Sequence, residues 1–197
     1  MVRQFVEIGM DTKTSIVDLR IEHTDIIKQL APLVHEAFQA HAPGWLPTVA
    51  EAEEEILESL EPKKISRVLL DAARQPLGWI GAIPHNSGRI WEIHPLVIAA
   101  SEQGKGYGQQ LVRDLERLAS ARGVLTLEAG TSDQTEATTL SGVDLYKDPA
   151  QAIANIGNLK RHPYEFYVKI GFKVVGVMPD AEGPGKPGII LAKWVEA

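Results

Sequence analysis

The segment that most constrains the fold runs from residue 90 to residue 122, where an apolar strand leads through a glycine-rich turn into an amphipathic helix. The run 90–98 is largely apolar, and Gly104, Gly106 and Gly108 follow it closely. A glycine turn at the start of a helix leaves backbone N–H groups unpaired and pointing outward, and the helix dipole adds partial positive charge there. These features predict a site for a phosphate group.

Other glycine-rich motifs fit this turn less well. A P-loop requires Lys and then Ser or Thr after its last glycine, whereas Gln109 follows Gly108 here. A dinucleotide fingerprint requires Gly-x-Gly-x-x-Gly and a later acidic residue for the ribose, whereas this chain has Gly-x-Gly-x-Gly without that residue. A plain strand-to-helix connection stays open as an alternative, because glycine turns are common.

The length and charge of the chain bound its class. Its 197 residues suit a single domain that buries most of its apolar surface. The net charge of −6 argues against non-specific nucleic-acid binding, which depends on neutralising phosphates with Lys and Arg. An acidic surface suits a cationic small molecule as partner, and it is also an ordinary charge for solubility.

Composition also excludes several kinds of site. The chain contains no cysteine, so disulfides and thiolate chemistry are impossible. Its six histidines form no His-Glu-x-x-His pair, and we expect no metal. No apolar run approaches the roughly 18 residues that span a bilayer, and the N-terminus lacks a signal-peptide pattern. We therefore expect no membrane association and a cytoplasmic location.

Hydrophobic periodicity predicts one mixed α/β domain over residues 15–197, with a strand-helix-strand unit at its centre. Residues 1–14 show no clear period and are expected to be a disordered leader. Thr48 and Glu51 form a capping-box pattern at the start of the second helix, and the long polar segment 130–149 is a candidate binding loop. The expected elements are the strand 15–21, the helices 24–39 and 49–60, the strands 65–72, 77–83 and 90–98, the helix that ends near 122, the strand 124–129, the helices 150–159 and 163–170, and the strands 172–178 and 188–195.

The central strand carries the first candidate catalytic residues. Side chains alternate along a strand, so Glu92 and His94 share one face while Trp91 and Ile93 share the other. A solvent-facing strand or a paired buried carboxylate would explain the two polar residues equally well. Pro95 cannot donate a ladder hydrogen bond, and it predicts a bulge or a local splaying of the strand.

A second candidate site lies in the aromatic stretch 166–172. Phe166 and Tyr167 precede Gly171, an arrangement that is usually core packing with a glycine helix cap. Tyr167 is also a phenol with an ordinary pKa of about 10, and such a group can donate a proton to a thiolate leaving group.

The glycine-rich turn and the aromatic stretch 166–172 each resemble a signature of the GCN5-related N-acetyltransferase (GNAT) superfamily. The stretch from Gln103 to Gly108 is similar to its Gln/Arg-x-x-Gly-x-Gly/Ala pattern, whose N–H groups hold the pyrophosphate of coenzyme A, and the second signature places Tyr167 near the cofactor's sulfur. The resemblance implies the GNAT fold, a mostly antiparallel central sheet with flanking helices and a parallel, splayed pair formed by the fourth and fifth strands. It also implies acetyl-coenzyme A as cosubstrate. The residues expected at the cofactor are Leu96, Val97, Ile98, Gln103, Gly104, Lys105, Gly106, Tyr107, Gly108, Gln109 and Tyr164.

Longer strings resemble the aminoglycoside 6′-N-acetyltransferases of that superfamily. The strings are 81–84, 91–97, 138–141, 144–146, 162–167, 175–179, 185–187 and 192–193. The resemblance implies acetyl transfer to the 6′-amine of an aminoglycoside in a ternary complex, by a homodimeric enzyme of antibiotic resistance. It makes Glu92 the general base, directly or through water, with His94 beside it and Tyr167 as the acid. A backbone N–H near Leu96 or Val97 would polarise the thioester carbonyl.

The acceptor is less sharply defined than the cofactor. Gly188 stands where relatives often carry an acidic residue, and the loop 132–137 resembles them less than its flanks do. A polyamine, a peptide or a protein lysine is therefore an alternative acceptor, and a non-catalytic coenzyme A-binding module is a third reading. Acidic residues of the helix near 51–55 are further candidates for acceptor contacts, although helix stability also explains them. The residues expected to meet the acceptor are Trp45, Glu92, Asp133, Glu136 and Asp144.

Overall fold

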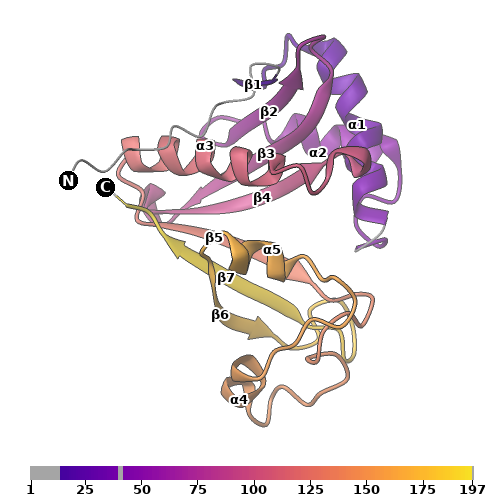
Figure 1. Ribbon diagram of the computed structural model, residues 1–197, viewed down its shortest axis with the longest axis vertical. Helices are drawn as coiled ribbons and strands as arrows, with labels where there is room; N and C mark the ends of the chain where they lie inside the picture. Colours follow the sequence, from indigo (N-terminus) through magenta and orange to yellow (C-terminus); the bar gives the residue numbers. More distant parts are fainter. Residues whose placement is uncertain (1–13, 40–41, 197) are drawn as a thin grey trace, which may run out of the picture.

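Seven strands form the sheet at the centre of the computed structural model, which describes residues 14–39 and 42–196 (Figure 1). The strands are β1 (Thr14–Asp18), β2 (Ile65–Asp71), β3 (Pro76–His85), β4 (Ile90–Ile98), β5 (Thr126–Ser132), β6 (Lys173–Met178) and β7 (Gly188–Trp194). Their order is β1-β2-β3-β4-β5-β7-β6, and only β4 and β5 are parallel neighbours. The predicted mixed α/β fold, mostly antiparallel with one parallel pair, is confirmed. The expected leader spans residues 1–14. Thr14 instead begins β1, and residues 1–13 lie outside the described residues.

Helices cover both faces of the sheet (Figure 1). They are α1 (Thr24–Gln39), α2 (Val49–Glu58), α3 (Tyr107–Ala121), α4 (Pro149–Ala154) and α5 (Tyr164–Lys169), with short 3-10 turns η1 (Asn86–Gly88) and η2 (Ala100–Glu102). On one face, α1 and α2 pack over a core that includes Leu30, Ile56 and Trp79. On the other, α3 and α5 share a larger core that includes Leu111 and Tyr167.

The ends of the helices follow from their capping residues. Thr48 Oγ1 accepts a hydrogen bond from the Glu51 N–H at 3.2 Å, and the Thr48 N–H donates to the Glu51 carboxylate at 2.9 Å, which confirms the predicted capping box. At the end of α3, Gly123 has a φ of +71° and Val124 donates back to the Ala119 carbonyl. Val124 therefore closes the helix, and β5 begins two residues later than the pattern predicts.

The predicted helix 150–159 is too long. The structure ends α4 at Ala154, because the following residues bond to a distant loop instead. The Gly157 N–H donates to Thr139 Oγ1 at 2.8 Å, and the Leu159 N–H donates to the Ala137 carbonyl at 2.7 Å. These bonds fasten the long segment after β5 against the segment that leads into α5.

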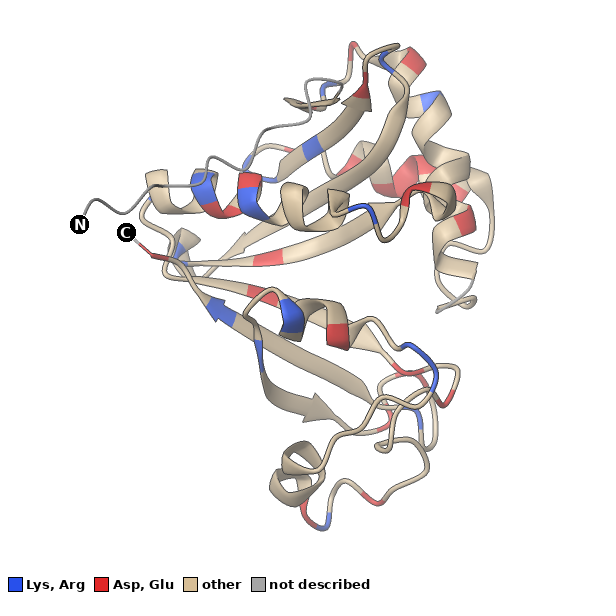
Figure 2. Cartoon of the chain, in the orientation of Figure 1, with Lys and Arg blue, Asp and Glu red and all other residues tan. Residues whose placement is uncertain are grey.

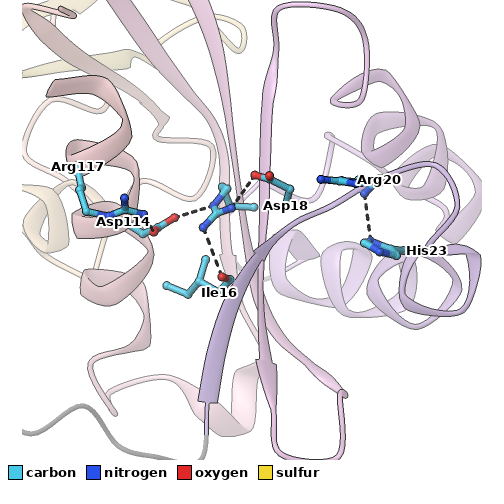
Figure 3. Close-up of polar contacts among 7 residues, drawn as sticks. Ile16, Asp18, Arg20, His23, Asp114 and Arg117 are labelled. Atoms are coloured by element: carbon cyan, nitrogen blue, oxygen red, sulfur yellow. Dashed lines mark hydrogen bonds and ion pairs between the residues drawn. The ribbon is translucent and has the colours of Figure 1, made fainter. Parts of the chain in front are cut away.

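A buried cation joins β1, β2 and α3 (Figure 3). Arg67 of β2 is 8% exposed, and its guanidinium donates to Asp114 of α3 at 2.7 Å and to Asp18 of β1 at 2.6 Å. It also reaches the Ile16 carbonyl at 3.4 Å, while Arg117 donates to Asp114 from the solvent side at 2.9 Å. Burial alone would lower the pKa of Arg67, but the hydrogen bonds to the two carboxylates raise it, so the guanidinium stays charged and paired.

We predict that Asp114→Asn lowers the free energy of unfolding by about 1–3 kcal/mol, because it leaves a buried guanidinium with one charged partner fewer. Urea unfolding followed by circular dichroism measures the change. Arg117→Gln is the control, since that side chain pairs with Asp114 from the surface and should change stability by less than about 0.5 kcal/mol. Equal losses in the two variants would contradict the role given to Arg67.

Candidate active site

A β-bulge in the middle of β4 shapes the site. The register between β3 and β4 shifts at Gly81, where two residues of β4, His94 and Pro95, lie opposite one residue of β3. A Cβ at Gly81 would lie 2.2 Å from the His94 carbonyl oxygen, so only glycine allows this approach. Beyond Ile93, β4 no longer pairs with β5, and the two strands diverge (Figure 1). The bulge and splaying predicted from Pro95 are confirmed.

The bulge also changes which side chains of β4 face α3. Before it, Trp91 and Ile93 belong to the core under α3, and after it Leu96 and Ile98 pack against that core. Val97 lies instead in the core under α1 and α2. The strand thus fills both cores although its edge has turned away from β5.

We predict that Gly81→Ala lowers the free energy of unfolding by about 1–3 kcal/mol, because the methyl group would press β3 away from the bulge. Thermal or urea unfolding measures the loss. Gly130→Ala is the matched control, since a Cβ at Gly130 meets no atom within 4 Å, and its stability should stay within about 0.5 kcal/mol of the wild type. A stable Gly81→Ala protein would show that the bulge does not need glycine opposite it.

A cavity of about 1300 Å³ occupies the space where β4 and β5 diverge. Its walls are the β4 segment 92–98, the glycine turn, the end of β5, α5, the start of β7, and the loops that hold Trp45 and Glu182. Sites for one drug-sized ligand usually measure roughly 300–1,000 Å³. The cavity is therefore large enough to take two substrates side by side.

The glycine turn forms one end of the cavity. Gly104 and Gly106 have φ values of +79° and +87°, which favour glycine, and Gly106 is the N-cap of α3. A Cβ at Gly108 would come within 3.2 Å of the Phe166 ring, so this glycine lets α3 and α5 approach closely. An open helix N-terminus with such a turn is suited to an anion.

Most residues expected at the cofactor line this cavity. Those that do are Leu96, Val97, Ile98, Gln103, Gly104, Gly106, Tyr107, Gly108 and Gln109. Lys105 lies outside the wall and pairs with Glu102 at 2.9 Å. Tyr164 also lies outside it, because the ring is buried in the core next to His162. The part of these two residues in cofactor binding stays a prediction.

Glu92 and His94 lie in a row of alternating carboxylates and imidazoles. His85 Nε2 is 2.8 Å from one oxygen of Glu92, and His94 Nδ1 is 3.9 Å from the other. On its far side, His94 Nε2 is 3.4 Å from a carboxylate oxygen of Glu55 in α2. The hydrogen bond to Glu55 is the main cause that raises the pKa of His94, and it outweighs the opposing effect of burial. The Trp45 ring packs 5.5 Å from the His94 ring.

Tyr167 lies on the opposite wall of the cavity, in α5. Its ring packs between Phe166 and Phe172, with centroid distances of 5.2 and 5.3 Å. Burial raises the pKa of Tyr167 well above its ordinary value. The phenol therefore keeps its proton and can act as an O–H donor toward the cavity.

Comparisons with known proteins identify the family. The model of the acetyltransferase (GNAT) family matches residues 30–147. The chain belongs to this family. Three solved structures are similar over 93% of this chain and 98% of their own: an aminoglycoside 6′-N-acetyltransferase complexed with coenzyme A (36% identity, TM-score 0.84), the aminoglycoside 6′-N-acetyltransferase from Enterococcus faecium (36%, 0.81) and an aminoglycoside 6′-acetyltransferase type Ii (29%, 0.69). No curated protein sequence matches the chain.

In this GNAT acetyltransferase, Trp45 and Glu92 line the cavity, but the three acidic residues of the long loop that are expected at the acceptor, Asp133, Glu136 and Asp144, do not. Asp133 is fully buried, and its carboxylate accepts hydrogen bonds from Ala137, Thr138 and Ser141 at 2.7 to 2.9 Å. Burial alone would raise the pKa of Asp133, but these bonds lower it, so the carboxylate holds its own loop together and is not open to a substrate.

The other two expected acids of the long loop, Glu136 and Asp144, are exposed and do not line the large cavity. Asp144 instead borders a separate hollow of about 260 Å³ that also includes Asp180. Their expected contact with the acceptor is therefore not supported by their position.

The acetyltransferase has an acidic wall residue that the sequence did not indicate. The Glu182 carboxylate, in the loop between β6 and β7, accepts hydrogen bonds from Ser132 at 2.6 Å and Gln134 at 3.0 Å. Gln134 also accepts one from the Gly44 N–H at 3.3 Å. Nothing in the spacing of these residues marks them, because only the folded loops bring them together.

Over residues 14–39 and 42–196, no group of three or more His, Asp or Glu is placed to hold a metal ion. Within the same ranges, no helix has the length and apolar character needed to cross a membrane.

Proposed function

We propose that this GNAT acetyltransferase transfers acetyl from acetyl-coenzyme A to the 6′-amine of an aminoglycoside, with both substrates bound together. The observation that carries the proposal is the single cavity that joins the glycine turn to Glu92. Support also comes from the similarity to aminoglycoside 6′-N-acetyltransferases, one of which is complexed with coenzyme A.

The residues of the cavity fit the cofactor. The N–H groups of the glycine turn would hold its pyrophosphate, because Gly104 and Gly106 leave the start of α3 open. The edge of β4 that no longer pairs with β5 would bind the extended pantetheine arm through strand-like hydrogen bonds. Leu96 and Val97 lie on that edge, so one of their N–H groups would donate to the thioester carbonyl.

The proposed chemistry balances atoms and protons. Bound acetyl-coenzyme A supplies an acetyl thioester, whose carbonyl carbon bonds to the amine nitrogen as the carbon–sulfur bond breaks. Glu92 binds the acceptor ammonium and removes a proton, directly or through water. Burial raises the pKa of Tyr167, so the phenol is protonated before the reaction and can donate a hydrogen bond to the departing sulfur. The sulfur takes the proton as the carbon–sulfur bond breaks, and Tyr167 regains one from solvent.

We propose that the acceptor lies between Trp45, Glu92 and Glu182. All three line the cavity, and the hydrogen-bond donors on Glu182 are the neutral groups of Ser132 and Gln134. These neutral donors do not offset the negative charge of the Glu182 carboxylate, so it can pair with a second ammonium group of the acceptor. A single exposed ion pair contributes only about 0–1 kcal/mol, so several such contacts are needed for a polycation.

We also propose that the enzyme acts as a cytoplasmic homodimer and confers aminoglycoside resistance. The edge strand β6 and the adjoining β7 expose Val175, Met178 and Trp194, which supports a second copy as partner. A cytoplasmic location agrees with the intracellular supply of acetyl-coenzyme A. Acetylation removes the positive charge of the 6′-amine, and this change would weaken binding of the antibiotic to an anionic target.

We predict that Glu92→Gln lowers kcat by about a hundredfold or more while KM for acetyl-coenzyme A changes little, because the amide can neither bind an ammonium ion pair nor accept its proton. Initial-rate kinetics at saturating acceptor measure both parameters. Glu136→Gln, an exposed position away from the cavity, is the control. Unchanged turnover in Glu92→Gln would remove this residue from the mechanism.

The acceptor is tested by thiol release. With kanamycin or tobramycin as acceptor, we expect saturable release of free coenzyme A, which a thiol-reactive dye reports cleanly because the protein has no cysteine. An analogue with a 6′-hydroxyl in place of the amine should give none. Release with spermidine or a lysine peptide alone would keep the acetyltransferase and reject the aminoglycoside as its substrate.

A further inference from the structure

Glu55 belongs to α2 and contacts His94, a residue of the cavity wall, without lining the cavity itself. Its side chain is 16% exposed and faces His94, with 3.4 Å between the Glu55 carboxylate and His94 Nε2. Among the described residues that form the cavity wall, His94 is present and Glu55 is not. The contact through which Glu55 can act on the reaction is therefore the one with the His94 imidazole.

Helix stability does not explain an acidic residue at this position. Figure 2 shows that α2 is rich in acidic residues, and Glu51 near its start has a capping role. Glu55 lies in the last turn of α2, where the helix dipole favours positive charge. Its position is unfavourable to the helix by itself, which points to the contact with His94 as its purpose.

The two ring nitrogens of His94 face different carboxylates. Because the Glu55 carboxylate can only accept, it selects the tautomer with the proton on Nε2. Nδ1 then carries a lone pair and lies 3.9 Å from Glu92. We propose that Glu55 is a positioning residue that holds His94 with Nδ1 toward Glu92, so that the imidazole accepts the proton that leaves the attacking amine. This inference rests on the proposed function.

The proton can be followed through each group. The amine loses it to the Glu92 carboxylate or to a water beside it. The proton then moves to His94 Nδ1 when acceptor binding brings Nδ1 and Glu92, 3.9 Å apart in this structure, within hydrogen-bond reach. The imidazolium lies between the carboxylates of Glu55 and Glu92, which balance its charge. The His94 side chain is 38% exposed, so the proton can pass on to solvent and reset the enzyme.

The charged groups around His94 favour the imidazolium. Glu55 from α2 and Glu92 from β4 raise the pKa of His94, while Lys64, just before β2, acts in the opposite direction. His85 from β3 contacts the far oxygen of Glu92, and the Trp45 ring covers one side of the imidazole. Glu55 provides the largest of these effects, which makes it the group to change.

The test compares Glu55→Gln with Glu58→Gln. Both variants remove one negative charge from α2, but Glu58 is exposed and is not among the charged groups that shift the pKa of His94. We expect Glu55→Gln to lower kcat by about tenfold, with KM for acetyl-coenzyme A unchanged, because the base loses its charged partner. Glu58→Gln should match the wild type. An equal effect in the two variants would overturn the proposal.

A double variant separates positioning from a general structural role. If Glu55 acts through the imidazole, Glu55→Gln should lower kcat about tenfold in the wild-type background. In a His94→Gln background the same change should cause little further loss of kcat. The same loss in both backgrounds would mean that Glu55 acts independently of His94, and it would overturn the proposal.

Titration of the His94 ring by NMR gives a reading that needs no acceptor. The His94 ring resonance is assigned as the one missing from the spectrum of His94→Gln. Its titration midpoint should lie at lower pH in Glu55→Gln than in the wild type, and it should be unchanged in Glu58→Gln. An unchanged titration midpoint of His94 in Glu55→Gln would overturn the proposed interaction between Glu55 and His94, even if aminoglycosides are good substrates. A shifted titration without aminoglycoside turnover would support the pair and reject the proposed acceptor.

Discussion

The site depends on a steric constraint, the close contact between the backbone of Gly81 and the carbonyl of His94. Pro95 interrupts the middle of a central strand, and the strand tolerates it only because the opposing residue has no side chain. From this contact follow the bulge, the divergence of β4 from β5 and the cavity between them. The same few residues thus form part of the core and create the opening between the two strands.

Much of this arrangement could be predicted from local patterns. The glycine turn, the capping box at Thr48 and the bulge at Pro95 each depend on residues that are close in the sequence. The face shared by Glu92 and His94 follows from alternation along one strand. Element ends were less predictable, since Val124 continues the hydrogen bonding of α3 and the residues after Ala154 pair with a remote loop.

The acceptor residues could be predicted only in part, because charge in the sequence does not reveal which way a side chain faces. Trp45 and Glu92 line the cavity as expected, whereas the acidic residues of the long loop do not. Asp133 looked like a binding residue in a polar loop, yet it is buried and satisfied by the backbone of that loop. Glu55 was one of several acids on one helix, and only the fold shows that it alone contacts His94. Such pairings between distant segments carry no periodic signal.

The hydrogen bonds around Gln134 have a consequence for the engineering of this enzyme. One side chain links the loop before α2, through Gly44, with the loop between β6 and β7, through Glu182. These segments come from opposite ends of the chain, and both border the cavity. A designer who transplants one loop from a relative with a different acceptor preference would break this shared junction, so the three segments should be exchanged together as one unit.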